Sequence, residues 1–438
     1  DTPEGMVESC MEFLRICVAE NFTDVVISIK ASNTVVMVKT VRLLVDVMEK
    51  EGMAFPLHLG VTEAGDGEDG RIKSALGIGA LLSDGLGDTI RVSLSEAPEA
   101  EIPVARKLVD YVLLRQEHPY IPGLEAPEFN YLSPERRKTK AVRNIGGEHV
   151  PVVIADRMDG KTEVNPQFTP DYIYAGRALP EQREEGVEYI LDADVWQGEA
   201  GTWPAFNHAQ LPLMGECDAA LKFLFIPYMA QTDEVIACLK YHPEVVIISQ
   251  SNHPNRLGEH RALVHQLMTE GLQNPVVFFQ HYAEDDAENL QIKSAADMGA
   301  LIFDGLCDGI FLFNQGSLSH AVVDATAFGI LQAGRTRTSK TEYISCPGCG
   351  RTLYDLEKTI ARIKAATSHL KGLKIGIMGC IVNGPGEMAD ADYGYVGAGR
   401  GKISLYKGKV CVEKNIPEEE AVERLLEFIR TDREENQQ

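Results

Sequence analysis

The sequence has no apolar run long enough for a membrane-spanning helix, which needs about 20 predominantly apolar residues, and it shows no secretory signal. Positive charge is in deficit, because the formal net charge at pH 7 is -23. Such an excess of negative charge argues against broad binding to nucleic acid or to an anionic membrane surface. We therefore expect neither a nucleic acid nor a membrane as a partner of this 438-residue chain.

Cysteine is scarce and irregularly spaced, with nine residues in the whole chain. An odd number without a regular framework excludes the disulfide scaffold of a small secreted protein. We therefore expect a reducing compartment. Five cysteines lie in apolar or helical contexts and are predicted to be buried small side chains: Cys10, Cys17, Cys217, Cys238 and Cys307.

Short apolar runs alternate with helical patterns over residues 1–116. The predicted strands are Val25–Ile29, Pro56–Val61 and Thr89–Leu94, and the helices that follow them are Val35–Lys50, Gly70–Leu82 and Pro103–Leu114. This βα repetition predicts a parallel sheet of the TIM-barrel type. Three units cannot close a barrel of eight, and the chain opens on a helix start at Thr2-Pro3-Glu4. We therefore expect further barrel strands upstream.

Two more domains are predicted after this partial barrel. Residues 117–150 are rich in turn signals and form a linker, residues 151–335 form an insert domain of strands and helices, and residues 341–438 form a third domain. The third domain is predicted to contain a strand at Lys374–Met378 and a hairpin at Gly397–Val412. The predicted fold class is α/β, with a partial TIM-type barrel, a second barrel-like α/β insert and a C-terminal α+β domain.

An internal repeat links the first two domains. Ile72–Ala75 recurs as Ile292–Ala295 and Asp84–Leu86 recurs as Asp304–Leu306, both at an offset of 220 residues. Repetition at a constant offset predicts that the insert is a duplicated, barrel-like copy of the first domain.

The two copies differ where strands end. At the same offset Lys30 becomes Gln250, Arg91 becomes Phe311 and Ser93 becomes Phe313. The polar residues of the first copy are thus replaced by neutral or apolar ones. We interpret the first copy as lining a site for an anionic ligand and the second, degenerate copy as a scaffold.

Polar side chains follow three successive predicted strands, at the carboxyl ends where βα folds carry their chemistry. Lys30, Glu63, Arg91 and Ser93 supply two cations, a carboxylate and a hydroxyl. This combination predicts a phosphate or diphosphate site. Each residue alone could instead cap a helix or form a buried ion pair. His58 lies inside a predicted strand and is expected to be a satisfied core residue.

A C-x-x-C pair, Cys346 and Cys349, is followed by a third cysteine, Cys380, in a glycine-rich loop. No fourth cysteine has suitable spacing, because Cys411 falls in the predicted hairpin. Three thiolates with one distinct position are typical of an iron–sulfur cluster with one special iron, and Glu387 is a candidate for a weak fourth ligand. The same cysteines with a His or a carboxylate could hold zinc, although structural zinc usually brings a second close pair.

The segment from Cys346 to Cys411 is basic within an acidic protein, with ten Lys or Arg and five Asp or Glu. It is either an ordinary mixed surface or a docking face for an acidic partner such as a small electron carrier.

These motifs resemble those of the 4-hydroxy-3-methylbut-2-enyl diphosphate synthase family. Cys346–Thr352 and Gly379–Glu387 are similar to the cluster motifs of that family, and three segments are similar to its late barrel strands: Ser28–Ser32, His58–Gly65 and Asp88–Ser93. The resemblance covers residues 1–116 and 341–430, and the insert resembles the middle domain of the three-domain form of the family.

The resemblance implies an iron–sulfur oxidoreductase of isoprenoid biosynthesis. Its substrate would be 2-C-methyl-D-erythritol 2,4-cyclodiphosphate, and its product (E)-4-hydroxy-3-methylbut-2-enyl diphosphate. The reaction is a two-electron reductive dehydroxylation with ring opening in the methylerythritol phosphate pathway. Ferredoxin or flavodoxin would donate the electrons, and the compartment would be the bacterial cytoplasm, or the plastid stroma if the source is a plant.

The resemblance also implies roles for nine residues. Cys346, Cys349 and Cys380 would hold a [4Fe-4S] cluster, with Glu387 as a fourth ligand that substrate displaces. Lys30, Arg91 and Ser93 would bind the diphosphate. Glu63 would supply a proton or orient the substrate, and Asn383 would lie near the substrate.

Two other classes of function remain open at this point. One is a hydro-lyase in which a three-cysteine cluster acts as a Lewis acid without net reduction, and dependence on a reductant distinguishes it from a reductase. The other is a non-catalytic zinc-binding module on a barrel-like scaffold, which metal analysis distinguishes from a cluster protein.

Overall fold

The computed structural model describes residues 2–161, 164–352 and 354–435. The chain divides into two compact units, the first comprising Asp1–Ile78, Leu86–Arg106 and Thr338–Gln438, and the second Gly79–Gly85 and Lys107–Arg337. The outer ends of the predicted first and third domains, at residues 1 and 436–438, lie outside the described residues. Across the described residues no helix is both long and apolar enough to cross a membrane.

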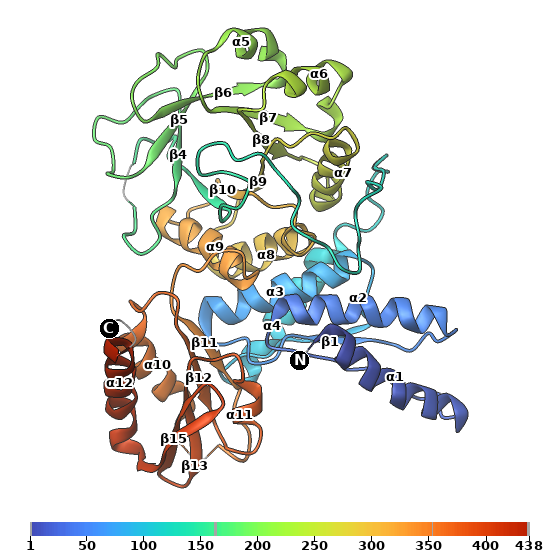
Figure 1. Ribbon diagram of the computed structural model, residues 1–438, viewed down its shortest axis with the longest axis vertical. Coiled ribbons are helices and arrows are strands. Elements are labelled where there is room, and N and C mark those ends of the chain that lie inside the picture. The colour runs from blue at the N-terminus through green and yellow to red at the C-terminus, as the bar shows by residue number, and fades with distance from the viewer. Residues whose placement is uncertain (1, 162–163, 353, 436–438) are drawn as a thin grey trace. The chain divides into compact units, whose positions relative to one another are not determined.

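The N-terminal part of the first unit alternates helices with short strands (Figure 1). Its elements are α1 (Pro3–Ala19), α2 (Thr34–Lys50), β1 (His58–Gly60), α3 (Gly67–Ser83), β2 (Thr89–Arg91), η1 (Pro98–Ala100) and α4 (Glu101–Leu113). The two strands are parallel, with His58 opposite Thr89 and Gly60 opposite Arg91. The predicted βα order is therefore present.

Side-chain caps explain where the first two helices begin. The Thr2 hydroxyl accepts a hydrogen bond from the Gly5 amide, and the Asn33 side chain accepts from Val35 and Val36. Each cap satisfies backbone N–H groups that have no partner inside the helix. The helix start predicted at Thr2 is thus confirmed.

The strands of this part are shorter than predicted. Val25–Ile29 is extended but forms no strand, because only Ile27 in it is bridged to a neighbour, Leu57. One bridge does not make a ladder of backbone hydrogen bonds. A second isolated bridge joins Ala31 to Val61, which keeps the carboxyl ends of these two segments side by side.

The C-terminal part of the first unit is a five-stranded sheet with helices, drawn in orange to red in Figure 1. Its elements are β11 (Glu342–Ser345), α10 (Leu356–Thr367), β12 (Lys374–Met378), α11 (Gly384–Glu387), β13 (Tyr393–Gly399), β14 (Lys402–Lys407), β15 (Val410–Pro417) and α12 (Glu418–Glu435). The first three strands are parallel and the last three antiparallel. The strand predicted at Lys374–Met378 is confirmed, and the predicted hairpin is part of a three-strand meander.

The second unit contains a closed barrel of eight strands, all parallel to their neighbours. The strands are β3 (Val152–Asp156), β4 (Tyr172–Gly176), β5 (Glu188–Asp192), β6 (Thr202–Asn207), β7 (Lys222–Pro227), β8 (Val245–Gln250), β9 (Val276–Tyr282) and β10 (Gly309–Asn314). The α/β class with a parallel barrel is therefore confirmed, and this barrel is complete.

Helices cover only part of that barrel. They are η2 (His208–Gln210), α5 (Leu211–Glu216), η3 (Tyr228–Ala230), α6 (Asp233–Tyr241), α7 (Arg256–Thr269), α8 (Ala287–Phe303) and α9 (His320–Ala333). None of the described residues between β3 and β6 forms a helix, so these strands are joined by loops, as the green part of Figure 1 shows.

Aromatic side chains fill the barrel interior. The Phe279 ring lies 5.0 Å from the Phe311 ring and 5.9 Å from the Phe313 ring, and the Tyr174 ring lies 5.6 Å from Phe225. Phe311 is only 1% exposed. Edge and stacked contacts of this kind stabilise a packed core, so the interior of this barrel is not an open cavity.

Candidate active site

A backbone contact joins the strand ends of the N-terminal part to the C-terminal part of the first unit. Ala64 is bridged in parallel to Ser345 at the end of β11. The Ser95 hydroxyl reinforces this contact, because it donates to the Ser345 carbonyl at 3.0 Å and lies 2.8 Å from the Ser345 hydroxyl. Glu63 and Cys346, the residues adjacent to the bridge, are thereby brought to the same place.

An ionic seam lies beside this bridge. We use this name for Asp66, Glu68 and Asp69 around the start of α3 and for the two lysines that they hold, Lys340 and Lys364. The Lys340 ammonium lies 2.6 Å from Glu68 and 2.7 Å from Asp69, and Lys364 pairs with Asp66. Carboxylates at the start of a helix also interact favourably with its dipole.

The two parts of the first unit enclose a hollow of about 200 Å³. It is lined by Thr62, Glu63, Arg91, Cys346, Pro347, Gly348, Cys349, Arg351, Thr352, Met378, Gly379, Cys380, Asn383, Gly384 and Glu387. Seven of the nine residues singled out in the sequence line it. Lys30 and Ser93 are not in the lining, but both lie close to Arg91.

Backbone amides point at two of the cysteine sulfurs. The Gly379 N–H donates to Cys346 Sγ at 3.2 Å, and the Arg351 N–H donates to Cys349 Sγ at 3.4 Å. Burial raises the pKa of the Cys346 thiol, whereas the Arg351 side chain lowers the pKa of the exposed Cys349 thiol. Such N–H groups stabilise thiolates and cluster sulfurs.

Arg351 is a site residue that the sequence reasoning did not single out. Its guanidinium is exposed and interacts with Cys349, Cys380 and Glu387. The signal was a basic residue two positions after the C-x-x-C pair.

Glycines let the cysteine loops pack closely. A Cβ on Gly379 would collide with the Thr352 hydroxyl, and a Cβ on Gly397 would collide with the Gly379 carbonyl. Only glycine avoids both contacts. The glycine-rich sequence around Cys380 therefore brings its loop against the C-x-x-C segment.

The donor set suits a polynuclear cluster. Three thiols and the Glu387 carboxylate line the walls of one hollow. Within the described part of the chain, no three His, Cys, Asp or Glu side chains are gathered tightly enough to hold a single metal ion. Soft thiolates together with amide donors to sulfur are the ligands and environment that iron–sulfur clusters use.

Glu63 is a buried carboxyl group at the edge of the hollow. It is 6% exposed, and its backbone has a φ of 48°, a left-handed conformation that is uncommon outside glycine. Burial raises its pKa to about 7, with a further increase from the Glu387 carboxylate and decreases from Thr62 and Arg91. A carboxyl group with this pKa can hold and release a proton near neutral pH.

Lys30 and Arg91 form a pair of neighbouring cations. Arg91 Nη2 donates to the Ser93 hydroxyl at 3.1 Å, and Lys30 Nζ donates to the Ser28 hydroxyl. Burial and the Arg91 charge lower the pKa of Lys30. Among the described residues neither cation forms an ion pair with a carboxylate, so both are available to an anion.

His58 is not the core residue that its position in a strand predicted. It is only half-buried, and its Nδ1 lies 2.7 Å from the Thr89 hydroxyl. Burial, Lys30 and Arg91 lower its pKa, in that order. His58 therefore lies beside the two cations.

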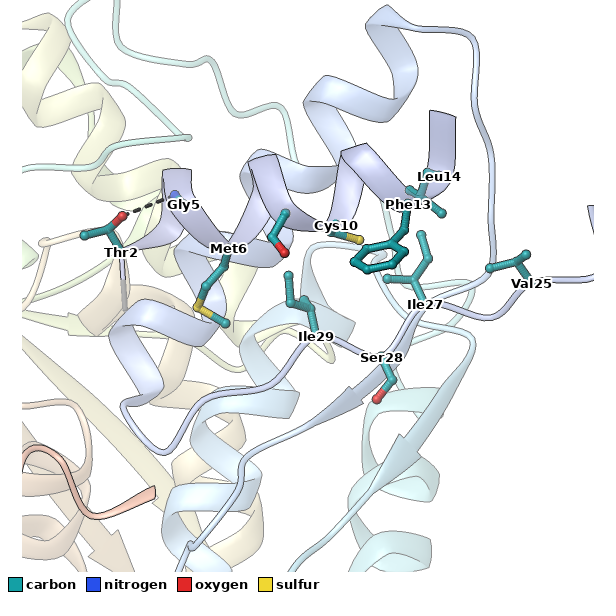
Figure 2. Close-up of a pocket in the computed structure, with 11 residues that line it drawn as sticks. Thr2, Gly5, Met6, Cys10, Phe13, Leu14, Val25, Ile27, Ser28 and Ile29 are labelled. Atoms are coloured by element: carbon teal, nitrogen blue, oxygen red, sulfur yellow. Dashed lines mark hydrogen bonds between the residues drawn. The ribbon is translucent and has the colours of Figure 1, made fainter. Parts of the chain in front are cut away.

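A larger hollow of about 680 Å³ lies elsewhere, between α1 and residues 25–29. Figure 2 shows Cys10, Phe13, Leu14 and Ile27 among the side chains around it. None of the nine residues singled out in the sequence lines it. Its lining is mostly apolar, and its polar side chains are the hydroxyl groups of Thr2, Ser9 and Ser28 and the thiol of Cys10.

The fold and the hollow point to one class of protein, and comparison with known sequences identifies it. Residues 1–106 match the GcpE TIM-barrel domain, and residues 342–431 match the GcpE protein C-terminal domain. Together with the relatives described next, these matches show that the chain belongs to the GcpE family.

Curated bacterial relatives cover almost the whole chain. A protein of Bacteroides thetaiotaomicron is 95% identical over 435 residues, which is 99% of this chain and 71% of the relative. A protein of Parabacteroides distasonis is 60% identical over 98% of this chain and 70% of the relative, and one of Porphyromonas gingivalis is 48% identical over 98% and 69%. All three are named 4-hydroxy-3-methylbut-2-en-1-yl diphosphate synthase (flavodoxin).

Proposed function

We propose that this chain carries the active site of an oxidoreductase that forms (E)-4-hydroxy-3-methylbut-2-enyl diphosphate from 2-C-methyl-D-erythritol 2,4-cyclodiphosphate in isoprenoid biosynthesis. The observation that carries the proposal is the single hollow in which Cys346, Cys349, Cys380 and Glu387 face Glu63 and Arg91. The names of the close relatives support it.

The same names support flavodoxin, in preference to ferredoxin, as the electron donor. The bacterial origin of these relatives favours the bacterial cytoplasm over a plastid. We infer that the three cysteines hold a [4Fe-4S] cluster, with Glu387 as its displaceable fourth ligand. When bound, such a cluster passes electrons singly and offers one iron as a Lewis acid.

The protein's own groups bind the substrate and supply a proton. Lys30, Arg91 and Ser93 bind the diphosphate, because two cations and a hydroxyl at one sheet edge match its charge and oxygen atoms. Ring opening breaks the bond between carbon and the bridging phosphate oxygen, and dehydroxylation releases a second oxygen as water. Two electrons and two protons balance the reaction.

Glu63 holds one of those protons. Its carboxyl group is protonated to a useful extent at neutral pH because its pKa is about 7, and it faces the hollow from the strand side. Asn383 lies in the same lining, which supports its proposed role as a hydrogen-bonding partner of the substrate.

We further propose the domain assignment. Residues 1–116 form the C-terminal part of a catalytic TIM barrel, 117–150 a linker, 151–335 a degenerate insert barrel and 341–438 the cluster domain. The largely apolar hollow beside α1 (Figure 2) and the match of residues 1–106 to the GcpE TIM-barrel domain support the assignment of the first part. Phe311 and Phe313, which replace Arg91 and Ser93 in the insert, support its role as a scaffold.

Turnover of the cyclic diphosphate by the anaerobic, cluster-loaded enzyme tests this function. We expect product only when reduced flavodoxin or a chemical reductant is present. Equal turnover without any reductant would favour a hydro-lyase, and no turnover under either condition would overturn the proposal.

A further inference from the structure

His58 and Thr89 lie on the same face of the small sheet as the two cations. Leu57, Leu59 and Val61 are each no more than 6% exposed on one side of their strand segment. Because side chains alternate along a strand, His58 and Gly60 point to the opposite side. Thr89 and Arg91 are their partners in the parallel register.

Gly60 has no side chain, and this leaves room on this face of the sheet for the side chain of Lys30. A Cβ at this position would lie 2.8 Å from Lys30 Cε, so the Lys30 side chain passes directly over Gly60. The ammonium of Lys30, the guanidinium of Arg91 and the imidazole of His58 therefore surround one patch. Both cations are near enough to His58 to lower its pKa.

We infer that His58, held by Thr89, is a further ligand of the substrate diphosphate. This inference rests on the proposed function of the same site.

The hydrogen bond to Thr89 explains how the imidazole would act. Burial, Lys30 and Arg91 lower the pKa of His58, which favours the neutral imidazole. When the Thr89 hydroxyl donates to Nδ1 over their 2.7 Å separation, Nε2 carries the proton. Nε2 has no protein partner among the described residues, so its N–H can donate to a phosphate oxygen.

Equilibrium binding of inorganic pyrophosphate to the cluster-loaded enzyme at pH 8 tests the inference without turnover. We expect His58→Phe, which keeps a ring but removes both nitrogens, to weaken binding about tenfold or more, the effect of one hydrogen bond to a charged group. His58→Gln should recover part of the loss, and Thr89→Val should lose less than His58→Phe. His369→Phe, at an exposed position in the third domain, is the matched control.

The His58 and Thr89 variants should raise the KM for the cyclic diphosphate more than they lower kcat, with unchanged visible absorption of the cluster. Unchanged pyrophosphate affinity in His58→Phe, with a loss in Arg91→Met, would overturn the role of His58 and leave the diphosphate site standing. Unchanged affinity in both variants would count against the diphosphate site itself.

Discussion

At the scale of single residues, burial changes the acid–base properties of the Glu63 carboxyl group. Its ordinary pKa of 4.5 rises to about 7 because the side chain is removed from water beside another carboxylate. The backbone of Glu63 has a left-handed φ of 48°, which is a strained conformation. The bridge between the next residue, Ala64, and Ser345 holds the backbone in this conformation. Perturbed pKa values and strained backbone concentrate at functional sites.

Replacing Glu63 by Gln should lower kcat by about 10²- to 10⁴-fold, the usual contribution of a positioned acid. Because the acid form is the active one, the wild-type rate should fall as pH rises through about 7, and the variant should lack this step. Iron and sulfide content should be unchanged. A variant with normal kcat would show that Glu63 is not the proton donor.

The same shift makes a prediction about stability. The unfolded carboxyl group ionises near pH 4.5 and the folded one near 7, so the folded state binds more protons between these values. The free energy of unfolding should therefore fall as pH rises through this window, by at most about 3 kcal/mol. Urea unfolding at pH 5 and pH 8 measures it. Glu63→Gln should lose this pH dependence, and the exposed Glu99→Gln should keep it.

At the scale of elements, the cysteine loops depend on glycine. A methyl group on Gly379 would collide with Thr352 and displace the amide that donates to Cys346. We expect Gly379→Ala to lower the cluster content after reconstitution by at least half, without a change in far-ultraviolet circular dichroism. Gly399→Ala, where a Cβ meets nothing within 4 Å, is the control. Full cluster content in Gly379→Ala would contradict this account of the loop.

The ionic seam should contribute to stability. The Lys340 side chain is only 13% exposed and is held by Glu68 and Asp69. Removing one partner of a buried pair leaves uncompensated charge and costs about 3 kcal/mol. We expect Lys340→Met to lower the free energy of unfolding by roughly that amount in urea titrations. A loss no larger than that of the exposed Lys371→Met would show that the seam is not stabilising.

Element order was predictable from the sequence, and strand extent was not. The helices predicted after each strand were found with ends shifted by a few residues, because periodicity and caps such as Asn33 are local signals. Val25–Ile29 has the apolar pattern of a strand but too few backbone partners to form one. The boundaries of β4, β5 and β6 have no such signal, because no helix separates these strands.

The site residues could be predicted from their residue types and their spacing in the sequence. The burial and the neighbours of these residues could not. The C-x-x-C pair and the glycine loop around Cys380 predicted that the three cysteines lie near one another. In the structure all three line one hollow. His58 was misjudged because its position in a strand does not reveal which face carries the cations. Four of the five cysteines predicted as buried are partly exposed, and only Cys307 is buried.

At the scale of the whole molecule, the two compact units differ in chemistry. The first unit carries the polar site, and the second is a closed barrel with an aromatic interior. Phe311→Ala should destabilise the second unit by about 3 to 5 kcal/mol, the usual cost of a large cavity. Differential scanning calorimetry measures the loss. Pyrophosphate affinity should not change, and a weaker affinity would contradict the role of the insert as a scaffold.

The most direct test of the central claim is the iron and acid-labile sulfide content of the protein after anaerobic purification and reconstitution. We predict about four irons and four sulfides per chain, the stoichiometry of a [4Fe-4S] cluster, and loss of both in Cys380→Ser with Cys307→Ser as the control. Stoichiometric zinc without sulfide, in protein that has gone through reconstitution, would contradict the claim.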